Sequence, residues 1–397
     1  MPTLLQINAT SNWGSTGRIV EQIGTLAVRD GWDCVVAWGR YSNPSAHRTI
    51  RIGNKLTVYE HYLENRLLDN EGRASRRATR EFLREVDRIA PDVVHLHNIH
   101  DHYLNYEALL RYLKAVNVPV VWTQHDCWAF TGGCMHYSWN GCLRWRSDCG
   151  RCPYHKGLFN HSAEQFARKR ALINSLDRLT LVPVSQWLGD VIGRSFLRDL
   201  PREVICNGVD LNVFQPITDE AFLASCGLSD RRYVLGVATA WHERKGLRDF
   251  ARLAEILDPG IRIVLVGVPD RAAASLPPAI QVLPRTHDQR ELAVLYTGAQ
   301  AVLNLSYEET FGLTTAEGFA CGTPSVVYDA TSSPELIGPG TGTVVPAGNI
   351  PALKQAVEDV CARGRAAFTA ACRDRAAALY DRDRNYARYI DLYHRIR

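Results

Sequence analysis

Short apolar runs recur along the whole chain, and each is followed by a polar or glycine-bearing turn and a helical pattern. In the first half these runs lie at residues 4–7, 34–38, 91–96, 118–122 and 182–185. In the second half they lie at residues 233–238, 262–267, 281–284, 301–305, 325–328 and 342–345. Continuous apolar runs bounded by turns are typical of strands that are buried on both faces of a parallel sheet. We therefore predict an α/β protein with two Rossmann-like βαβ domains.

A turn-rich crossing near residues 204–216 divides the two series of strands. We predict an N-terminal domain of residues 1–204 with a cysteine-rich insertion at 127–153, and a C-terminal domain of residues 205–380. Residues 381–397 form an amphipathic helix that we expect to pack back on the first domain. Two consecutive βα domains without a GxGxxG fingerprint favour a ligand in a cleft between domains that face each other.

Composition narrows the class of protein. The chain has 397 residues, 46% of them hydrophobic and 22% charged, which suits two domains with separate cores. A net charge of +4 does not indicate a nucleic-acid partner, although it permits attraction to an anionic membrane or a phosphorylated substrate. No apolar run approaches a membrane span, and residues 1–8 lack the pattern of a signal peptide. Eleven cysteines without such a signal indicate a reducing cytoplasm.

Residues 55–90 are predicted to be helical and basic. They carry Arg66, Arg73, Arg76, Arg77, Arg80, Arg84 and Arg88. A solvated helix face is the more ordinary interpretation of this pattern. The alternative is a surface that binds anionic lipid at the inner face of the plasma membrane, or a diphosphate-linked acceptor.

The stretch 308–324 is the first candidate for chemistry. Glu309 lies at a turn between a buried strand and a helix, and Glu317 follows about two helical turns later. The N-terminus of such a helix can hold phosphate through its backbone N–H groups, and flanking carboxylates can accept hydrogen bonds from sugar hydroxyls. The ordinary alternative is that Glu309 is an acid favoured by the helix dipole and that Glu317 is a solvated residue.

Polar side chains also follow two strands of the first half. His95, His97 and Asn98 lie at the end of one strand, and His125 and Asp126 follow the next. Open α/β sheets bind ligands at this edge, so the pattern favours a site for a sugar or an acceptor. A hydrogen-bonded structural role is equally consistent with His95.

Two glycine-bearing turns are candidates for contact with phosphate. Gly14 and Gly17 lie between the first strand and the helical pattern that starts at Ile19, although such turns need glycine for conformation alone. In the second half, Lys245 precedes Gly246 and can reach a diphosphate, with Arg244 as a second cation. A lysine on the surface is the ordinary alternative.

The insertion carries four closely spaced cysteines: Cys134, Cys142, Cys149 and Cys152. Four thiolates suit a tetrahedral structural zinc, which would order a short glycine-rich loop. A redox-labile dithiol loop and simple packing are the alternatives. The same segment contains Trp128, Trp139 and Trp145, which suit either a platform for a sugar or the core.

Taken together, these motifs resemble the retaining glycosyltransferases of family 4, which have the GT-B fold. The resemblance is carried in order by the motif 91–97, Asn207 to Asp210, Lys245-Gly246 and the Glu309…Glu317 stretch. More narrowly, residues 95–100, residues 125–128 and the cysteine cluster resemble bacterial capsule, colanic-acid or O-antigen transferases.

The resemblance implies roles for individual residues. Glu309 would hold the donor sugar at the reacting centre, Lys245 would neutralise the leaving diphosphate, and His125 would touch the sugar or stabilise the transition state. Glu317 would bind the ribose. The remaining donor-binding residues would be Arg244, Phe311, Gly312, Leu313 and Thr314. The diphosphate and acceptor loop would comprise Gly14, Ser15, Thr16, Gly17, His97 and Asn98.

The implied activity is transfer of a sugar from a nucleotide-diphosphate-sugar to a glycan or polyprenyl-linked acceptor. It would proceed with retention and without a catalytic cofactor, in cell-surface polysaccharide biosynthesis. Two departures stand out: Ala240 replaces an arginine common in the family, and Thr331-Ser332 replace a glycine pair. The alternatives are a nucleotide-sugar epimerase and a noncatalytic sugar- or nucleotide-binding protein.

Overall fold

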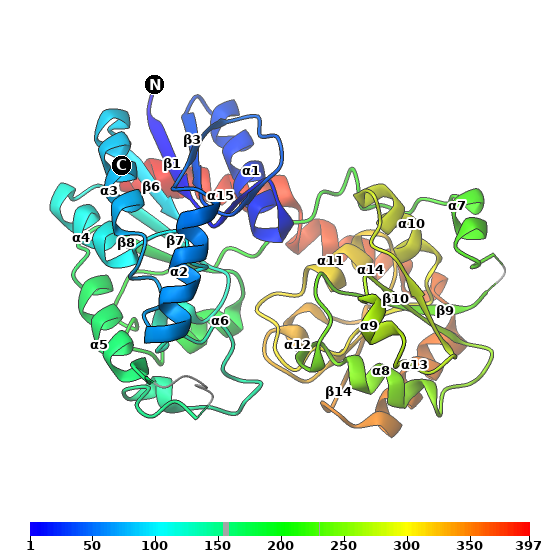
Figure 1. Ribbon diagram of the computed structural model, residues 1–397. Coiled ribbons are helices and arrows are strands. Elements are labelled where there is room, and N and C mark those ends of the chain that lie inside the picture. Colours follow the sequence, from blue (N-terminus) through cyan, green and yellow to red (C-terminus); the bar gives the residue numbers. More distant parts are fainter. Residues whose placement is uncertain (154–158, 230) are drawn as a thin grey trace. The chain divides into compact units, whose positions relative to one another are not determined.

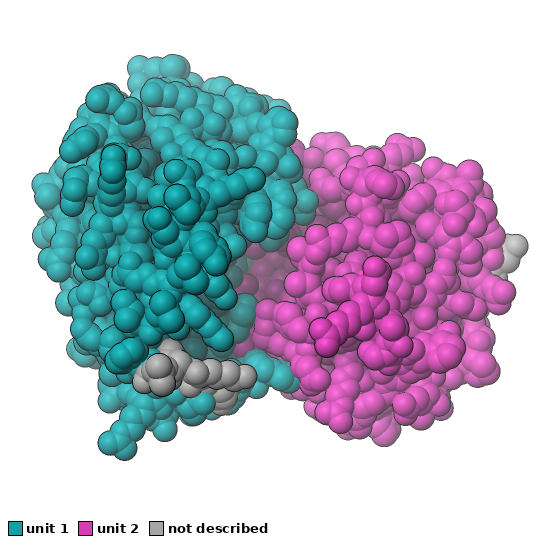
Figure 2. Space-filling view, viewed as in Figure 1, with its two compact units in different colours: residues 1–205, 386–397 teal, residues 206–385 magenta. Residues whose placement is uncertain are grey.

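The computed structural model describes residues 1–153, 159–229 and 231–397. They form two compact units, which Figure 2 colours separately. Unit 1 comprises residues 1–205 and 386–397, and unit 2 comprises residues 206–385. In the described residues, each unit is built on one parallel sheet of six strands. The prediction of two Rossmann-like βαβ sheets is therefore confirmed.

The sheet of unit 1 has the strand order β5-β3-β1-β6-β7-β8. The strands are β1 (Thr3–Ile7), β3 (Asp33–Trp38), β5 (Arg48–Arg51), β6 (Val93–Leu96), β7 (Val120–Gln124) and β8 (Leu179–Pro183). A small parallel pair, β2 (Thr10–Ser11) with β4 (Tyr41–Ser42), lies beside it. Strand order reverses between β1 and β6, and ligands of doubly wound sheets bind at the carboxyl ends of strands at such a point.

Helices surround this sheet (Figure 1). They are α1 (Gly14–Arg29), α2 (Lys55–Leu68), α3 (Arg76–Ile89), α4 (Tyr106–Val116), α5 (Ser162–Ile173), α6 (Gln186–Ile192) and α15 (Arg382–Ile396). Apolar residues of α1, such as Ile19 and Ile23, share a core with Leu4, Val93 and Val121 of the sheet. The insertion at 127–153 contains short 3-10 turns, η1 (Trp128–Phe130) and η2 (Arg144–Arg146).

The C-terminal helix α15 completes the same core. Tyr386, Tyr389 and Tyr393 are buried against the sheet and α1. The hydroxyl of Tyr393 lies 2.6 Å from Nδ1 of His95, and Oγ1 of Thr123 donates to the hydroxyl of Tyr389 at 3.0 Å. The prediction that the C-terminal helix packs back on the first sheet is confirmed, and His95 has the structural role.

The sheet of unit 2 has the same topology, in the order β11-β10-β9-β12-β13-β14. Its strands are β9 (Tyr233–Val237), β10 (Arg262–Val266), β11 (Ile280–Leu283), β12 (Ala301–Asn304), β13 (Ser325–Tyr328) and β14 (Gly342–Val345). Its helical segments are α7 (Glu220–Ser225), η3 (Glu243–Lys245), α8 (Leu247–Ala254), α9 (Asp270–Ala273), α10 (Gln289–Gly298), α11 (Leu313–Ala320), α12 (Ser333–Leu336), α13 (Ile350–Arg363) and α14 (Ala366–Leu379). Here the strand order reverses between β9 and β12.

Two local expectations need correction, and one strand was not predicted. The helix expected from Ile19 begins at Gly14, so the turn 14–17 is the first turn of α1. The basic stretch 55–90 is two helices, because Asp69 and Ser75 adopt left-handed conformations between them. Strand β5 was not predicted, since its sequence Arg-Thr-Ile-Arg is largely exposed at a sheet edge and lacks an apolar run.

Within the part of the chain that the structure describes, no helix combines the length and the apolar character needed to cross a membrane.

Candidate functional site

The unit 2 site lies where β9 and β12 end, at the reversal of strand order. Lys245 follows β9, and Glu309 follows β12. Nζ of Lys245 lies 2.6 Å from Oε2 of Glu309, and both side chains are largely but not fully buried. The structure thus brings together two of the three residues predicted to be catalytic.

Gly246 makes this approach possible. Its φ of +74° is in the left-handed region. A Cβ at this position would lie 2.3 Å from the carbonyl oxygen of Leu305, which directly follows β12. Only glycine fits a backbone that is both left-handed and this close to a neighbouring strand end. Gly246 therefore sets the distance between the lysine turn and the glutamate turn.

The main chain of Glu309 is clamped by the loop after β13. Its N–H donates to Oγ1 of Thr331 at 2.8 Å, and its carbonyl accepts from the hydroxyls of Thr331 and Ser332, each at 2.8 Å. Thr331 and Ser332 occupy the place of the family's glycine pair. In this chain their side chains fix the backbone that carries the central carboxylate.

Two arginines supply further positive charge near this edge. Arg244 donates to the carbonyl of Glu308 at 3.1 Å. Burial lowers the pKa of Arg244, although the neighbouring Glu308 and Glu309 act in the opposite direction. Arg285, which follows β11, donates to the carbonyl of Thr239 at 2.6 Å, beside the exposed Ala240. Arg285 could not be predicted from local pattern, because it is 45 positions from Ala240 and lies beside it only through the sheet order.

The predicted donor-binding residues surround the start of α11. Gly312 is left-handed (φ 100°) and precedes the helix, which Leu313 and Thr314 begin. Phe311 is buried and packs edge-on against Tyr380. Glu317 is 9% exposed, and its Oε2 accepts a hydrogen bond of 2.9 Å from Tyr296. Glu317 is therefore not the solvated helix residue of the ordinary alternative.

The unit 1 site lies at the corresponding reversal, between β1 and β6. Asn8, just after β1, accepts a hydrogen bond from the backbone N–H of Asn98 at 3.2 Å. Gly17 packs tightly behind this edge, because a Cβ there would lie 2.8 Å from Oγ1 of Thr10. Gly14 has open space around it and a φ of +66°, so conformation alone explains its glycine. Ser15 and Thr16 lie in the same first turn of α1.

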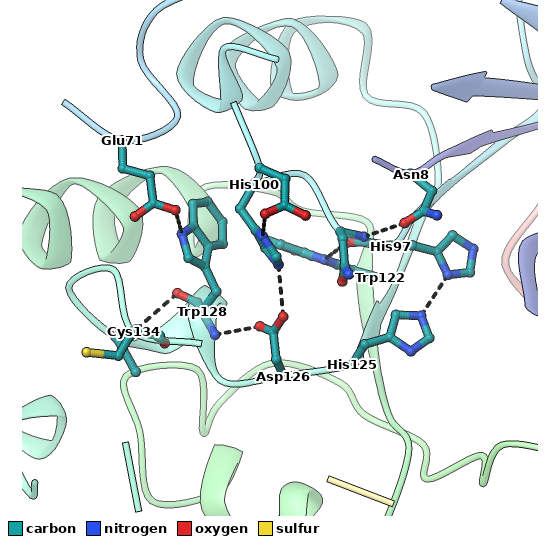
Figure 3. A network of polar contacts seen from close by, with 12 residues as sticks. Asn8, Glu71, His97, His100, Trp122, His125, Asp126, Trp128 and Cys134 are labelled. Carbon is teal, nitrogen blue, oxygen red and sulfur yellow. Dashed lines mark hydrogen bonds and ion pairs between the residues drawn. The ribbon is translucent and has the colours of Figure 1, made fainter. Parts of the chain in front are cut away.

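His97 and His125 meet at this edge (Figure 3). Nδ1 of His97 lies 3.0 Å from Nε2 of His125, and Nε2 of His97 lies 3.2 Å from Oε1 of Gln6. Burial lowers the pKa of His125 to about 4 and that of His97 well below its usual range. Both imidazoles are therefore neutral near pH 7, which excludes a positive charge on His125 in the resting protein.

His100, which was not predicted as a site residue, pairs with Asp126. Nε2 of His100 lies 2.8 Å from Oδ2 of Asp126, and Oδ1 of Asp126 accepts from the N–H of Trp128 at 2.8 Å (Figure 3). Burial alone would lower the pKa of His100, but the carboxylates of Asp126 and Asp101 outweigh it and raise the pKa to about 10. Asp126 thus pairs with His100 through one carboxylate oxygen and holds the backbone of the following loop through the other.

A second buried charged group supports that loop. Nζ of Lys169 donates to the carbonyl of Trp128 at 2.6 Å and lies 4.0 Å from the centre of its ring. The indole N–H of Trp128 donates to Glu71 at 3.1 Å (Figure 3). Burial raises the pKa of Glu71 and lowers that of Lys169 to about 8. Trp128 and Trp145 are buried and Trp139 is partly exposed, so two of the three tryptophans belong to the core.

The four cysteines of the insertion gather around one cavity of about 380 Å³. They are present as thiols, and Sγ of Cys149 accepts from the N–H of Gly132 at 3.1 Å. Among the described residues, however, no group of three or more histidine, cysteine or acidic side chains is arranged to hold a metal ion. The thiol geometry therefore gives no support to the predicted zinc site at Cys134, Cys142, Cys149 and Cys152.

Comparison with known sequences connects both sites to one family. A family described as "Glycosyltransferase Family 4" matches residues 16–213, and one described as "Glycosyl transferases group 1" matches residues 231–363. The D-inositol 3-phosphate glycosyltransferase of Mycobacteroides abscessus is 31% identical over 44% of this chain and 42% of its own length. The putative colanic acid biosynthesis glycosyl transferase WcaC of Escherichia coli is 30% identical over 33% of this chain and 35% of its own length. The aligned regions thus span less than half of the length of these relatives.

Solved structures share the whole fold. Sucrose-phosphate synthase of Thermosynechococcus elongatus superposes with a TM-score of 0.73 at 17% identity, over 100% of this chain and 99% of its own. HepE of Anabaena in complex with UDP gives a TM-score of 0.67 at 14% identity, over 99% of each chain. WaaG, a glycosyltransferase of lipopolysaccharide biosynthesis, gives 0.68 at 14% identity, over 97% of this chain and 98% of its own. With two family matches that together span most of the sequence, this chain belongs to the group 1 and family 4 glycosyltransferases, which have the GT-B fold.

Proposed function

We propose that this protein transfers a sugar from a nucleotide-diphosphate-sugar to a glycan acceptor with retention of configuration. The observation that carries the proposal is the Lys245–Glu309 pair, 2.6 Å apart, at the strand-order reversal of unit 2. A cation and a carboxylate at this edge match the two parts of such a donor: the diphosphate is anionic, and the sugar hydroxyls donate hydrogen bonds.

In the proposed reaction, the bond between the anomeric carbon and the diphosphate oxygen breaks, and its electron pair leaves with the diphosphate. The acceptor hydroxyl oxygen bonds to the same face of that carbon, and its proton passes to the departing phosphate oxygen. Lys245 and the N–H groups at the start of α11 stabilise the charge that develops on the diphosphate. Glu309 holds the donor sugar at the reacting centre, and Glu317 binds the ribose.

The Lys245–Glu309 ion pair is the arrangement of the protein without a bound donor. When a diphosphate arrives, it competes with Glu309 for the ammonium group of Lys245. The clamp from Thr331 and Ser332 holds the Glu309 backbone in place, so its carboxylate can exchange the lysine for sugar hydroxyls without a change in the loop. Arg285 adds positive charge beside Ala240, where the family's arginine is missing, and Arg244 adds it beside Glu308.

The donor base and the acceptor are finer parts of the proposal. HepE, which shares the fold, binds UDP and UDP-glucose, and this makes uridine donors the first to test. The likeness to WcaC, whose name refers to colanic acid biosynthesis, supports an acceptor in cell-surface polysaccharide synthesis. As the acceptor we propose a polyprenyl-linked glycan.

Release of nucleotide diphosphate from a panel of sugar nucleotides, with and without lipid-linked acceptor, tests the function. We expect one donor to release its nucleotide with acceptor present and a glycosylated product to form. Conversion of the donor to an epimer would favour the epimerase, and binding without turnover would favour the noncatalytic protein. Lys245→Met should abolish turnover, whereas Lys114→Met, at a surface pair of the same 2.6 Å length with Asp177, should not.

Helix α2 supports contact with a membrane that carries such an acceptor. Leu56, Tyr59, Leu63 and Leu67 recur at helical spacing on one stripe, and they are between 38% and 66% exposed. The following helix α3 adds the exposed arginines Arg76, Arg77, Arg80, Arg84 and Arg88. Two of these arginines pair with acids of their own helix, Arg77 with Glu81 and Arg88 with Glu85. An exposed apolar stripe followed along the chain by an arginine-rich helix suits an anionic bilayer surface, so we propose peripheral binding there.

Sedimentation with vesicles tests this contact. We expect the protein to bind phosphatidylglycerol vesicles and to bind pure phosphatidylcholine vesicles much less. Leu56→Gln combined with Leu67→Gln should weaken binding at least tenfold. The matched control is Leu379→Gln on α14, which removes an exposed leucine of unit 2 and should leave binding unchanged. Equal binding to both vesicle types, or no effect of the double variant, would contradict the proposal.

A further inference from the structure

Gln6 fixes the first step of a hydrogen-bond chain that ends at His125. It lies in β1 and is fully buried. Its Nε2 donates to the carbonyl oxygen of Val20 at 2.9 Å. A carbonyl oxygen can only accept, so the amide nitrogen must be on that side and Oε1 on the other. Oε1 faces Nε2 of His97 at 3.2 Å, and because an amide oxygen also only accepts, Nε2 of His97 carries a proton.

His97 has little freedom to change this arrangement. Its backbone N–H donates to the carbonyl of Ile7 at 2.9 Å, and its carbonyl accepts from the indole N–H of Trp122 at 2.9 Å. The side chain is 1% exposed, and burial lowers its pKa well below the usual range. A neutral imidazole has one N–H, so the proton on Nε2 leaves Nδ1 as an acceptor.

This acceptor faces His125. Nδ1 of His97 lies 3.0 Å from Nε2 of His125. The ring planes differ by 16°, and the ring centres are 5.3 Å apart, so the rings meet nitrogen to nitrogen rather than face to face. Since Nδ1 of His97 accepts, Nε2 of His125 donates, and the neutral His125 then has an unprotonated Nδ1. Asp126 does not reverse this order, because its carboxylate pairs with His100.

We propose that Gln6 and His97 are positioning residues that hold His125 in the tautomer with its proton on Nε2. In this tautomer Nδ1 of His125 accepts a hydrogen bond from a hydroxyl group and cannot donate one to a phosphate oxygen. This rests on the proposed function in one respect, namely that the hydroxyl belongs to the donor sugar.

The side-chain nitrogen shifts of His97 and His125, measured by ¹⁵N NMR on the full chain at pH 7, test the tautomers directly. We expect a protonated Nε2 and an unprotonated Nδ1 in both rings. Assignments come from the spectra of His97→Asn and His125→Asn. A protonated Nδ1 on His125 in the wild-type protein would overturn the inference, whether or not the protein has transferase activity.

Variants separate positioning from a merely structural role. His97→Leu removes the acceptor, so His125 should populate both tautomers and kcat/KM should fall about 10- to 100-fold. In His97→Asn the amide oxygen can replace Nδ1, so the His125 tautomer should persist and kcat/KM should stay within about threefold. Gln6→Met, which removes the acceptor of His97, should release the tautomer of His97 even if His97→Leu folds poorly. An unchanged His125 tautomer in His97→Leu, or an unchanged His97 tautomer in Gln6→Met, would refute the chain.

The two levels of the proposal fail in different ways. If the tautomers are as expected but His125→Asn keeps full transferase activity, the hydrogen-bond chain stands and the role of His125 in the proposed function is wrong. If His125→Asn loses activity but the wild-type tautomer is reversed, His125 keeps its role and the chain from Gln6 is wrong.

Discussion

Nζ of Lys245 lies 2.6 Å from Oε2 of Glu309, although the two residues are 64 positions apart and follow different strands. Each partner neutralises the other before a donor binds. The ammonium group of Lys245 thereby compensates the charge of a carboxylate that lies close to the position expected for the diphosphate.

Loss of either partner should therefore affect catalysis far more than stability. We expect Lys245→Met and Glu309→Gln each to lower kcat/KM at least about 100-fold, since each removes a group that acts on the transition state. The thermal unfolding midpoint should fall only modestly, because the two side chains are 23% and 18% exposed and water can solvate the charge that is left. Steady-state kinetics with the active donor checks this, with Lys114→Met and Asp177→Asn as controls. Activity near the wild-type level in either site variant would refute the assignment.

Gly246→Ala should displace the lysine turn. The added Cβ meets the carbonyl oxygen of Leu305 at 2.3 Å and also forces alanine into a left-handed conformation. We expect a loss of stability above about 1 kcal/mol together with a large fall in kcat/KM. Gly31→Ala is the control, because Gly31 also has a positive φ, 88° against 74°, but nothing within 4 Å of the added Cβ. Urea unfolding and kinetics of both variants measure the two effects, and equal losses would show that the contact with Leu305 is unimportant.

The neutral state of His125 predicts the pH dependence of activity. Burial lowers the pKa of His125 to about 4. The nearby carboxylate of Asp126 acts to raise this pKa, and His100 acts to lower it further. We therefore expect no loss of activity from protonation of His125 between pH 5.5 and 8. The ratio of kcat/KM between wild type and His125→Asn should be constant over that range. A wild-type inflection near pH 6.5 that His125→Asn lacks would contradict the prediction.

The His100–Asp126 pair makes a prediction for stability. The folded pKa of His100, about 10, is above the usual 6.5, so the pair's contribution is fully present below pH 6.5 and is lost as pH rises toward 10. Asp126→Asn should cost about 3 kcal/mol near pH 6, because it leaves the buried His100 cation with only the more distant carboxylate of Asp101, 3.6 Å away. The difference from wild type in urea unfolding should shrink toward pH 10. Asp177→Asn, at an exposed pair, should show no such trend.

Much of the fold could be predicted because apolar runs such as 301–305 are continuous and local. Strand β5 could not, since an exposed edge strand needs no such run. The turns that carry Glu309, Lys245 and His125 were also visible, because polar residues directly follow buried strands. Local pattern contains no information about which strand ends become neighbours, so the clamp from Thr331 on Glu309 was not foreseen.

The same limit applies to the supporting residues of unit 1. Gln6 and His97 are 91 positions apart, and His100 and Asp126 are 26 apart. Each pair forms only because parallel strands place their carboxyl ends at one edge. The sequence could therefore identify histidines at strand ends as candidates, whereas their charge states depend on contacts that the folded chain creates.

Helix α15 has a consequence for how the chain folds during synthesis. Tyr386, Tyr389 and Tyr393 fill the core beneath the first sheet, yet they are made after all of unit 2. Residues 1–205 leave the ribosome with an open apolar face, and residues 206–385 can complete their own core first. The domain made first should thus be the last to reach its native state.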